Sequence, residues 1–241
     1  TRRSSDLNGP MGIMDLSAEL GFHKSTTHRL VTSLQYMGYI RQDEESLKYA
    51  LSLKFLEIGS KILEQTNMAS LIHPSLKKLS EQTGETVHLV RREGTEAVYI
   101  DKVESTVSSI RMVSRVGSRI PLYCSGVGKA LLAELPDPEI EDIWNSSEIT
   151  SLTPYTVTSL SDLMDRIRGV REAGYAMDDE ENEEGVRCIA VSIPDYHKEP
   201  VYALSISAPV SRMTDARIAE LSTDVLTFKK DLEKTLGFSR S

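Results

Sequence analysis

The stretch I-M-D-L-S-A-E-L-G-F-H-K-S-T-T-H-R-L-V-T-S-L-Q-Y-M-G-Y-I, which spans residues 13–40, decides the fold of the N-terminal part of the chain. Leu16 and Leu20 lie one helical turn apart, and Gly21 follows them where a left-handed residue often ends a helix. A second helix with an inward apolar stripe is predicted to begin near Lys24. Two short helices that flank a glycine-containing turn are the sequence pattern of a helix-turn-helix.

The start of the second helix is rich in side chains that hydrogen-bond phosphates or base edges. In a helix-turn-helix, the N-terminal end of this helix enters the major groove of DNA. We therefore predict DNA contacts from Lys24, Ser25, Thr26, Thr27, His28 and Arg29. A helix–glycine–helix segment also occurs in ordinary helical proteins, where Ser25 would be only an N-cap, so this motif alone does not decide the function.

A hairpin is predicted directly after the second helix, with strands at Tyr39–Gln42 and Lys48–Leu51. In that position a hairpin is a wing, and Arg41 and Lys48 are placed to touch the DNA backbone or minor groove. Residues 1–51 are thus predicted to form a winged helix-turn-helix domain. Residues 52–67 follow as an amphipathic linker helix, whose apolar stripe meets a second copy of the chain or packs on its own domain.

Charge is divided unevenly along the 241 residues, which hold 28 Lys and Arg against 36 Asp and Glu. The net charge of −8 points away from nucleic acid at first sight. Residues 1–62, however, hold eight basic and seven acidic side chains, so the acidity lies in the remainder and the N-terminal part can still present a basic face. No apolar run is long enough for a bilayer, and only two cysteines are present, so we expect a cytoplasmic protein without disulfides.

Residues 68–241 are predicted to form an α+β sensor-like domain, because strands alternate with helices over one continuous segment. Helices are predicted at Leu71–Gln82, near Pro138–Trp144, at Ser161–Glu172 and from about Thr214 to Leu236. Strands are predicted at Glu85–Arg91, Ala97–Val103, Ser109–Ser114, Cys188–Ile193 and Val201–Ala208.

Three places in this domain have a composition that suits ligand binding. The Gly-rich turn Ser125–Lys129 opens a helix, whose free N–H groups attract carboxylates or phosphates, although tight packing also explains its glycines. Ser205 and Ser207 share one face of a strand, where they either floor a polar pocket or face water. The acidic run Asp178–Glu184 is expected to be mostly solvated loop.

No hydrolytic or metal site is predicted from the five histidines and two cysteines, and no cofactor is expected. None of the histidines has a metal-ligand spacing such as H-E-x-x-H. A nucleophilic Cys124 or Cys188 with His88 as its base stays open as an alternative, although a small buried thiol is the simpler interpretation.

Six motifs, in their order and spacing, resemble the IclR family of bacterial transcriptional regulators over residues 12–237. They are H-K-S-T-T-H-R-L (23–30), K-Y-A-L-S-L-K-F-L-E-I-G (48–59), Y-I-D-K-V-E-S (99–105), Y-C-S-G-V-G-K-A-L-L-A (123–133), G-V-R-C-I-A-V-S-I-P (185–194) and L-S-I-S-A-P (204–209). Residues 111–123 and 178–188 are similar to the branch represented by KdgR, the regulator of pectin and sugar-acid catabolism.

The resemblance implies a winged helix-turn-helix, a linker helix and a GAF-like effector-binding domain, assembled as a homodimer or a dimer of dimers. It also implies that a small carboxylate, such as a keto or sugar acid, is bound by Gly126, Val127, Asp178, Cys188, Ser205 and Ser207. The amides of Gly126 and Val127 would hold the carboxylate, the serines would bind it or a keto oxygen, and Asp178 would accept a hydrogen bond from a ligand hydroxyl.

The chain departs from the family pattern at its start, since the family begins with an apolar helix and residues 1–11 have almost no apolar period. That helix is expected to be missing, or the sequence to be incomplete. We predict a ligand-responsive regulator, a repressor, that binds a palindromic double-stranded DNA operator without catalysis and without a membrane. The alternatives are a cysteine-dependent hydrolase and a sensor-only module that acts through protein partners.

Overall fold

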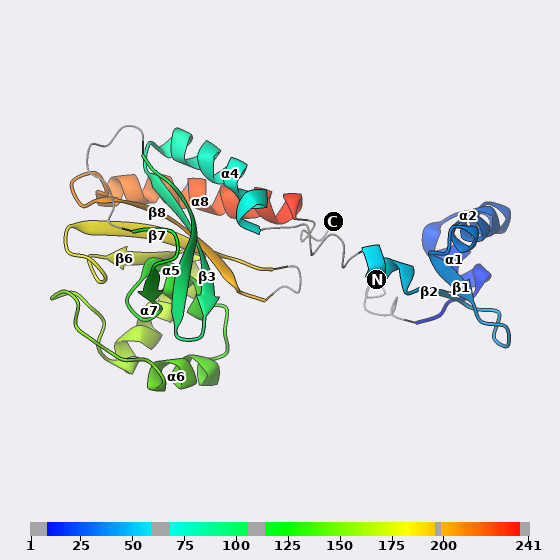
Figure 1. The fold of residues 1–241 in the computed structure, drawn as a ribbon, viewed down its shortest axis with the longest axis horizontal. Coiled ribbons are helices and arrows are strands. Elements are labelled where there is room, and N and C mark those ends of the chain that lie inside the picture. Colours follow the sequence, from blue (N-terminus) through cyan, green and yellow to red (C-terminus); the bar gives the residue numbers. More distant parts are fainter. Residues whose placement is uncertain (1–8, 59–67, 106–113, 196–198, 237–241) are drawn as a thin grey trace. The chain divides into compact units, whose positions relative to one another are not determined.

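A computed structural model describes residues 9–58, 68–105, 114–195 and 199–236 of the chain. Contacts within the chain divide it into two compact units, residues 1–67 and residues 68–241. Each unit has its own antiparallel sheet and its own helices (Figure 1). Over these described ranges, no helix is long and apolar enough to cross a membrane.

The N-terminal unit is a helix-turn-helix followed by a hairpin, as the sequence predicts. Its elements are α1 (Ile13–Leu20), α2 (Lys24–Tyr36), β1 (Ile40–Gln42) and β2 (Tyr49–Leu51). Gly21 ends α1 with a left-handed φ of 66°, which glycine adopts without steric cost. Met11 lies beside β2 and exchanges two backbone hydrogen bonds with Tyr49, of 2.9 and 2.8 Å, so a third extended segment joins the wing.

Two predictions for this unit fall mainly on residues outside the described ranges. Residues 54–58 are helical, in agreement with the start of the predicted linker helix, and residues 59–67 are outside them. The expectation that a first apolar helix is absent concerns residues 1–11, of which 1–8 are also outside.

The C-terminal unit is an α+β domain built on one six-stranded sheet. Its elements are α4 (Met68–Thr83), β3 (Thr86–Glu93), β4 (Glu96–Val103), β5 (Arg119–Pro121), α5 (Gly126–Leu132), α6 (Asp137–Asn145), α7 (Leu160–Ala173), β6 (Ala176–Asp179), β7 (Val186–Ile193), β8 (Tyr202–Pro209) and α8 (Asp215–Thr235). The strands follow the order β5-β4-β3-β8-β7-β6, and every neighbouring pair is antiparallel.

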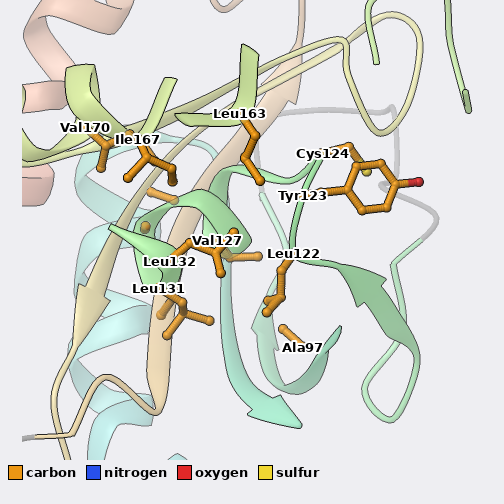
Figure 2. Close-up of a cluster of buried hydrophobic side chains, with 14 of the residues drawn as sticks. Ala97, Leu122, Tyr123, Cys124, Val127, Leu131, Leu132, Leu163, Ile167 and Val170 are labelled. Carbon is orange, nitrogen blue, oxygen red and sulfur yellow. The ribbon is translucent and has the colours of Figure 1, made fainter. Parts of the chain in front are cut away.

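Helices cover both faces of this sheet (Figure 1). Helices α4 and α8 pack on one face against the alternate residues Val87 and Leu89 of β3 and their neighbours on β7 and β8. Helices α5, α6 and α7 lie on the other face, where Ile167 and Val170 of α7 face the apolar side chains of α5 (Figure 2). Each face therefore has its own apolar core, and α5 lies inside the second one.

Glycine is required at one position of α5. A Cβ on Gly128 would lie 2.1 Å from the carbonyl oxygen of Leu122, far inside van der Waals contact. The tight-packing interpretation of the glycine turn is therefore correct for this residue. At the other glycine of the turn, Gly126, an added Cβ would lie 3.4 Å from its nearest neighbours, which is an ordinary contact distance.

The structure corrects the prediction for the acidic run. Asp178 lies in strand β6, which the sequence did not predict, and only 4% of Asp178 is exposed. Glu181 is only 2% exposed, because it forms a buried ion pair with Lys129 of α5. Two acids of the run are thus interior. The predicted strand at Ser109–Ser114 lies almost entirely outside the described residues.

Candidate DNA-binding and effector sites

The first two turns of α2 present most of the residues predicted to contact DNA. Lys24 and Ser25 are exposed on the first turn, His28 and Arg29 are exposed on the second, and Thr26 is half-buried. The residue that precedes the helix is His23, with an extended backbone at φ −63° and ψ 144°, so Ser25 is a helical residue and not the N-cap. These side chains remain available for recognition because they have no capping role.

Thr27 is the exception within this set. Its side chain is fully buried, and its hydroxyl donates to the carbonyl oxygen of His23 at 3.3 Å. The helical period turns this one position toward α1 while its neighbours point outward. The structure thus corrects the prediction, because Thr27 lies in the interior of the unit and not on its outer surface.

The wing carries its two predicted cations on exposed positions. Arg41 lies in the middle of β1 opposite Ala50, and Lys48 comes directly before β2. The tip is closed by Asp43, whose carboxylate accepts hydrogen bonds from the hydroxyl and the N–H of Ser46 at 2.7 and 2.8 Å. These bonds lower the pKa of Asp43, so the tip stays negatively charged, while the cations lie along the strands.

In the C-terminal unit, a cavity opens between the start of α5 and the sheet. Its lining includes all six residues predicted to bind an effector: Gly126, Val127, Asp178, Cys188, Ser205 and Ser207. The sheet order explains this convergence, since β3, β8, β7 and β6 are consecutive neighbours. The enclosed volume is about 30 Å³, which is roughly twice what one water molecule needs.

The start of α5 forms part of the wall of this cavity. The side chain of Ser125 caps the helix by accepting from the N–H of Gly128 at 3.1 Å, and its hydroxyl donates to Pro121 at 2.6 Å. Among the described residues, nothing accepts from the N–H groups of Gly126 and Val127. Two backbone donors at the cavity wall are therefore free for a ligand oxygen.

His88 is a cavity residue that the sequence did not assign to the effector site. It is 2% exposed, and its Nε2 lies 2.7 Å from the hydroxyl of Ser114. Its Nδ1 lies 3.3 Å from the hydroxyl of Ser207 and 3.5 Å from that of Ser205. Burial, assisted by the charge of Lys102, lowers the pKa of His88 to about 3, so the imidazole is neutral at physiological pH.

Tyr99 of β4 also lines the cavity and was not predicted. Its ring lies edge-on to His88, with 5.2 Å between the ring centroids. Burial raises the pKa of Tyr99, so the phenol keeps its proton. Sequence reasoning could have found His88 only from the strand order. His88 on β3 is paired with Ser205 on β8, and this pairing is not evident before the order of the strands is known.

Asp178 is the acid at the centre of this site. Its Oδ1 accepts the backbone N–H groups of Glu181 and Asn182 at 2.9 and 3.3 Å. Burial raises the pKa of Asp178 to about 7 despite the opposing charge of Lys129 and these two hydrogen bonds. None of the described lining residues is a lysine or an arginine, and Glu183 adds a second carboxyl group. The cavity therefore holds hydrogen-bonding groups without a cation.

The two cysteines are thiols in this environment. Burial raises the pKa of Cys124 to about 12 and raises the pKa of Cys188 as well. Both cysteines are free. A thiolate nucleophile would need the opposite shift. Over the part of the chain that the structure describes, no three His, Cys, Asp or Glu residues group as metal ligands do.

A winged helix-turn-helix unit together with an α+β unit that encloses a polar cavity defines the class of two-domain, helix-turn-helix transcription regulators. The chain belongs to the IclR family within this class. The model of the bacterial transcriptional regulator IclR C-terminal domain matches residues 60–233, and the IclR helix-turn-helix domain matches residues 5–44. The family assignment made from the six motifs is thus confirmed.

Named relatives span nearly the whole chain. The acetate operon repressor of Salmonella typhimurium is 36% identical and covers 98% of this chain and 86% of its own length. KdgR of Escherichia coli is also 36% identical, and the match covers 95% of this chain and 86% of the length of KdgR. The crystal structure of Thermotoga maritima IclR shares 32% identity, with a TM-score of 0.68 over 96% of this chain and 93% of that one.

These relatives are transcriptional regulators and repressors, and they are not enzymes. The prediction of a non-catalytic regulator is confirmed, and the cysteine-dependent hydrolase is wrong. The similarity to the KdgR branch stays a prediction, because the acetate operon repressor is just as similar to this chain.

Proposed function

We propose that this protein represses a catabolic operon and that a small carboxylate, such as a keto or sugar acid, controls its affinity for a palindromic operator. The observation that carries the proposal is the convergence of all six predicted effector residues on one cavity. Repression is supported by the relatives, several of which are named repressors. We place this activity in the cytoplasm, where a bacterial operator is accessible.

In this proposal the effector carboxylate lies at the start of α5. The free N–H groups of Gly126 and Val127 point to the same space and carry the partial positive charge of a helix start. Ser205 and Ser207 approach from the sheet and supply hydroxyls for a carboxylate or keto oxygen. Burial raises the pKa of Asp178 to about 7 and a bound anion disfavours a second negative charge, so Asp178 holds its proton and donates a hydrogen bond, in place of the accepting role that the resemblance implies.

The size of the cavity suggests how binding is transmitted. A volume of about 30 Å³ is too small for an acid of more than a few heavy atoms. Binding then requires β6 and the start of α5 to separate. We propose that this movement changes the spacing of two winged units in a homodimer or dimer of dimers. Operator affinity changes because only one spacing fits two half-sites on the duplex.

Calorimetry on the full chain with a panel of keto acids and sugar acids tests the effector site. We expect one acid to bind, and we expect Asp178→Ala to weaken that binding at least tenfold. Glu184→Ala, which removes an exposed acid of the same run, is the matched control and should bind as wild type. Unchanged affinity of Asp178→Ala would remove Asp178 from the site, and no binding by any acid would refute the proposed effector class.

DNA recognition is tested with a palindromic duplex that the protein selects from a random library. We expect affinity to fall steeply with salt, because phosphate contacts release counterions. Arg29→Ala should weaken binding about 10- to 100-fold, as the loss of one base or phosphate contact does. Lys78→Ala removes an exposed cation from the other unit and should have no effect. Failure to select any duplex would favour a sensor-only module that acts through protein partners.

A further inference from the structure

A second hollow lies at the outer edge of β6, outside the effector cavity. This cleft, which we call the β6 cleft, has a volume of about 370 Å³. Its floor includes Lys129 and Glu181, and its walls come from α7, including Arg166 and Gly169, and from β6 and β7. None of these residues lines the effector cavity. Strand β6 is the edge strand of the sheet, so the cleft is not closed by another strand.

The floor of the β6 cleft holds a carboxylate oxygen without a partner. Glu181 is 2% exposed and Lys129 is 1% exposed, and the lysine Nζ bonds to Oε1 of Glu181. The second oxygen, Oε2, is buried and has no hydrogen-bond partner among the described residues. Buried carboxylate oxygens are normally satisfied, so this oxygen can accept a hydrogen bond from a water molecule or from a ligand hydroxyl.

The wall of the β6 cleft is opened by a glycine in the middle of α7. A Cβ built on Gly169 would meet no atom within 4 Å, so no close packing demands glycine there. Glycine weakens a helix interior relative to alanine, and its presence here leaves free volume over the cleft. Arg166, one turn earlier on the same helix, forms no ion pair within the described residues and lies at the same cleft.

These groups select the chemistry of a ligand. The cleft is lined by three cationic side chains, Lys129, Arg166 and Arg187, and by three acidic ones, Asp165, Asp179 and Glu181, so its charges balance and favour neither an anion nor a cation. A neutral hydroxyl donates to Oε2 without adding a charge, and other hydroxyls accept from Arg166. We propose that the β6 cleft is a second ligand site of this protein and that it binds a neutral polyhydroxylated molecule, a monosaccharide or sugar alcohol.

The β6 cleft and the effector cavity are connected through two short links. The backbone N–H of Glu181 donates to Oδ1 of Asp178 at 2.9 Å, so one residue of each site bonds to the other. Lys129 and the free amides of Gly126 and Val127 belong to the same short helix. A polyol that binds Glu181 is therefore expected to shift Asp178 and to change the affinity of the protein for the acidic effector. The effector then changes the affinity for the polyol by the same factor.

Saturation-transfer NMR on the full-length protein tests the site, with glucose, galactose, xylose, mannitol and, separately, glycine and glutamate as probes. We expect at least one neutral polyol to receive saturation and the amino acids to receive none. Gly169→Leu fills the cleft and should weaken the binding of that polyol at least tenfold. Gly169→Ala, the matched control, adds one methyl group and should bind the polyol as wild type does. The exposed helical position has room for both side chains, so both variants should fold.

Glu181→Gln gives an independent second variant, because it keeps the shape of the side chain and exchanges the carboxylate for an amide. It should reduce polyol binding. Because it leaves Lys129 buried without its anion, the variant should be less stable than wild type, and circular dichroism must show a folded domain before polyol binding is compared. The proposal that the β6 cleft binds a polyol is refuted if no polyol binds, if an amino acid binds instead, or if Gly169→Leu binds the polyol as tightly as Gly169→Ala. Titration of Gly169→Leu with the keto and sugar acids separates this outcome from failure of the proposed effector, since that variant leaves the effector cavity intact.

Discussion

The proposed DNA-reading surface and the proposed effector cavity are assembled in opposite ways. The polar residues at the start of α2 are consecutive, from Lys24 to Arg29, and Thr27 alone among them is fully buried. The effector cavity draws its residues from all six strands of the sheet and from the start of α5, which are far apart in the sequence. A local motif therefore specifies the first site, whereas the second exists only when the whole sheet has formed. The two sites should respond differently to the same degree of structural damage.

The largest expected effect comes from Gly128→Ala, which damages only the cavity side of this comparison. The added Cβ would overlap the carbonyl of Leu122, so the start of α5 must move. We expect a loss of at least about 3–5 kcal/mol in unfolding free energy, as for severe overpacking with backbone displacement. The single tryptophan, Trp144, lies in α6, so denaturant unfolding followed by its fluorescence reports on the C-terminal unit alone.

Gly169→Ala is the control for that measurement. It adds the same methyl group at a position with open space and should leave the midpoint unchanged or raise it. Wild-type stability of Gly128→Ala would contradict the packing described for α5.

Lys129→Met should have the next largest effect, because it leaves Glu181 buried without its cation. Removing one partner of a buried ion pair typically costs about 3–5 kcal/mol, and we expect a loss within that range. The double variant Lys129→Met/Glu181→Leu should recover most of the loss in the same fluorescence measurement. A double variant that is as unstable as the single one would show that the pair contributes packing and not compensation of charge.

Asp178→Asn should change how the stability of the C-terminal unit depends on pH. A carboxyl group whose pKa is raised to about 7 by burial stabilises the fold at low pH, and this contribution is lost as pH rises through 7. Wild type should therefore lose stability relative to Asp178→Asn between pH 5 and 8, by up to about 1.4 kcal/mol per pH unit. The charged groups around Asp178 are Lys129 on α5 and Glu181 and Glu183 after β6.

The measured quantity is the difference between the two unfolding free energies at each pH. His88 titrates with the opposite sign, because its lowered pKa costs stability as pH falls below its ordinary value near 6.5. The difference between wild type and Asp178→Asn cancels that contribution. A difference that is flat from pH 5 to 8 would mean that Asp178 is ionised throughout.

The smallest expected effect is that of Thr27→Ser on the DNA side. Thr27 is buried, so the loss of its methyl group should cost about 1 kcal/mol of stability in the N-terminal unit. Affinity for the selected duplex should change less than threefold in gel-shift titrations. The matched exposed change, Ser25→Ala, should weaken binding more while it leaves stability unaltered. The reverse order would place Thr27 at the DNA surface.

The sequence was informative wherever a signal is local. Gly21 and the alternation of Ser205 with Ile206 predicted a helix end and the two faces of a strand correctly, because both depend only on neighbouring residues. Asp178 and Cys188 were placed in the site through family resemblance, since composition alone indicated a solvated acidic loop. Lys129 reverses that indication: a buried cation on a distant helix allows Glu181 to be interior.

The imidazole of His88 has a consequence for selectivity. A neutral ring donates from one nitrogen and accepts at the other, and the hydroxyls of Ser114, Ser205 and Ser207 rotate to suit either tautomer. The chain of hydrogen bonds through the cavity can therefore run in two directions without moving a heavy atom. One direction presents a proton to a ketone, and the other accepts a proton from an alcohol. The cavity should thus discriminate poorly between a 2-keto acid and its reduced 2-hydroxy counterpart.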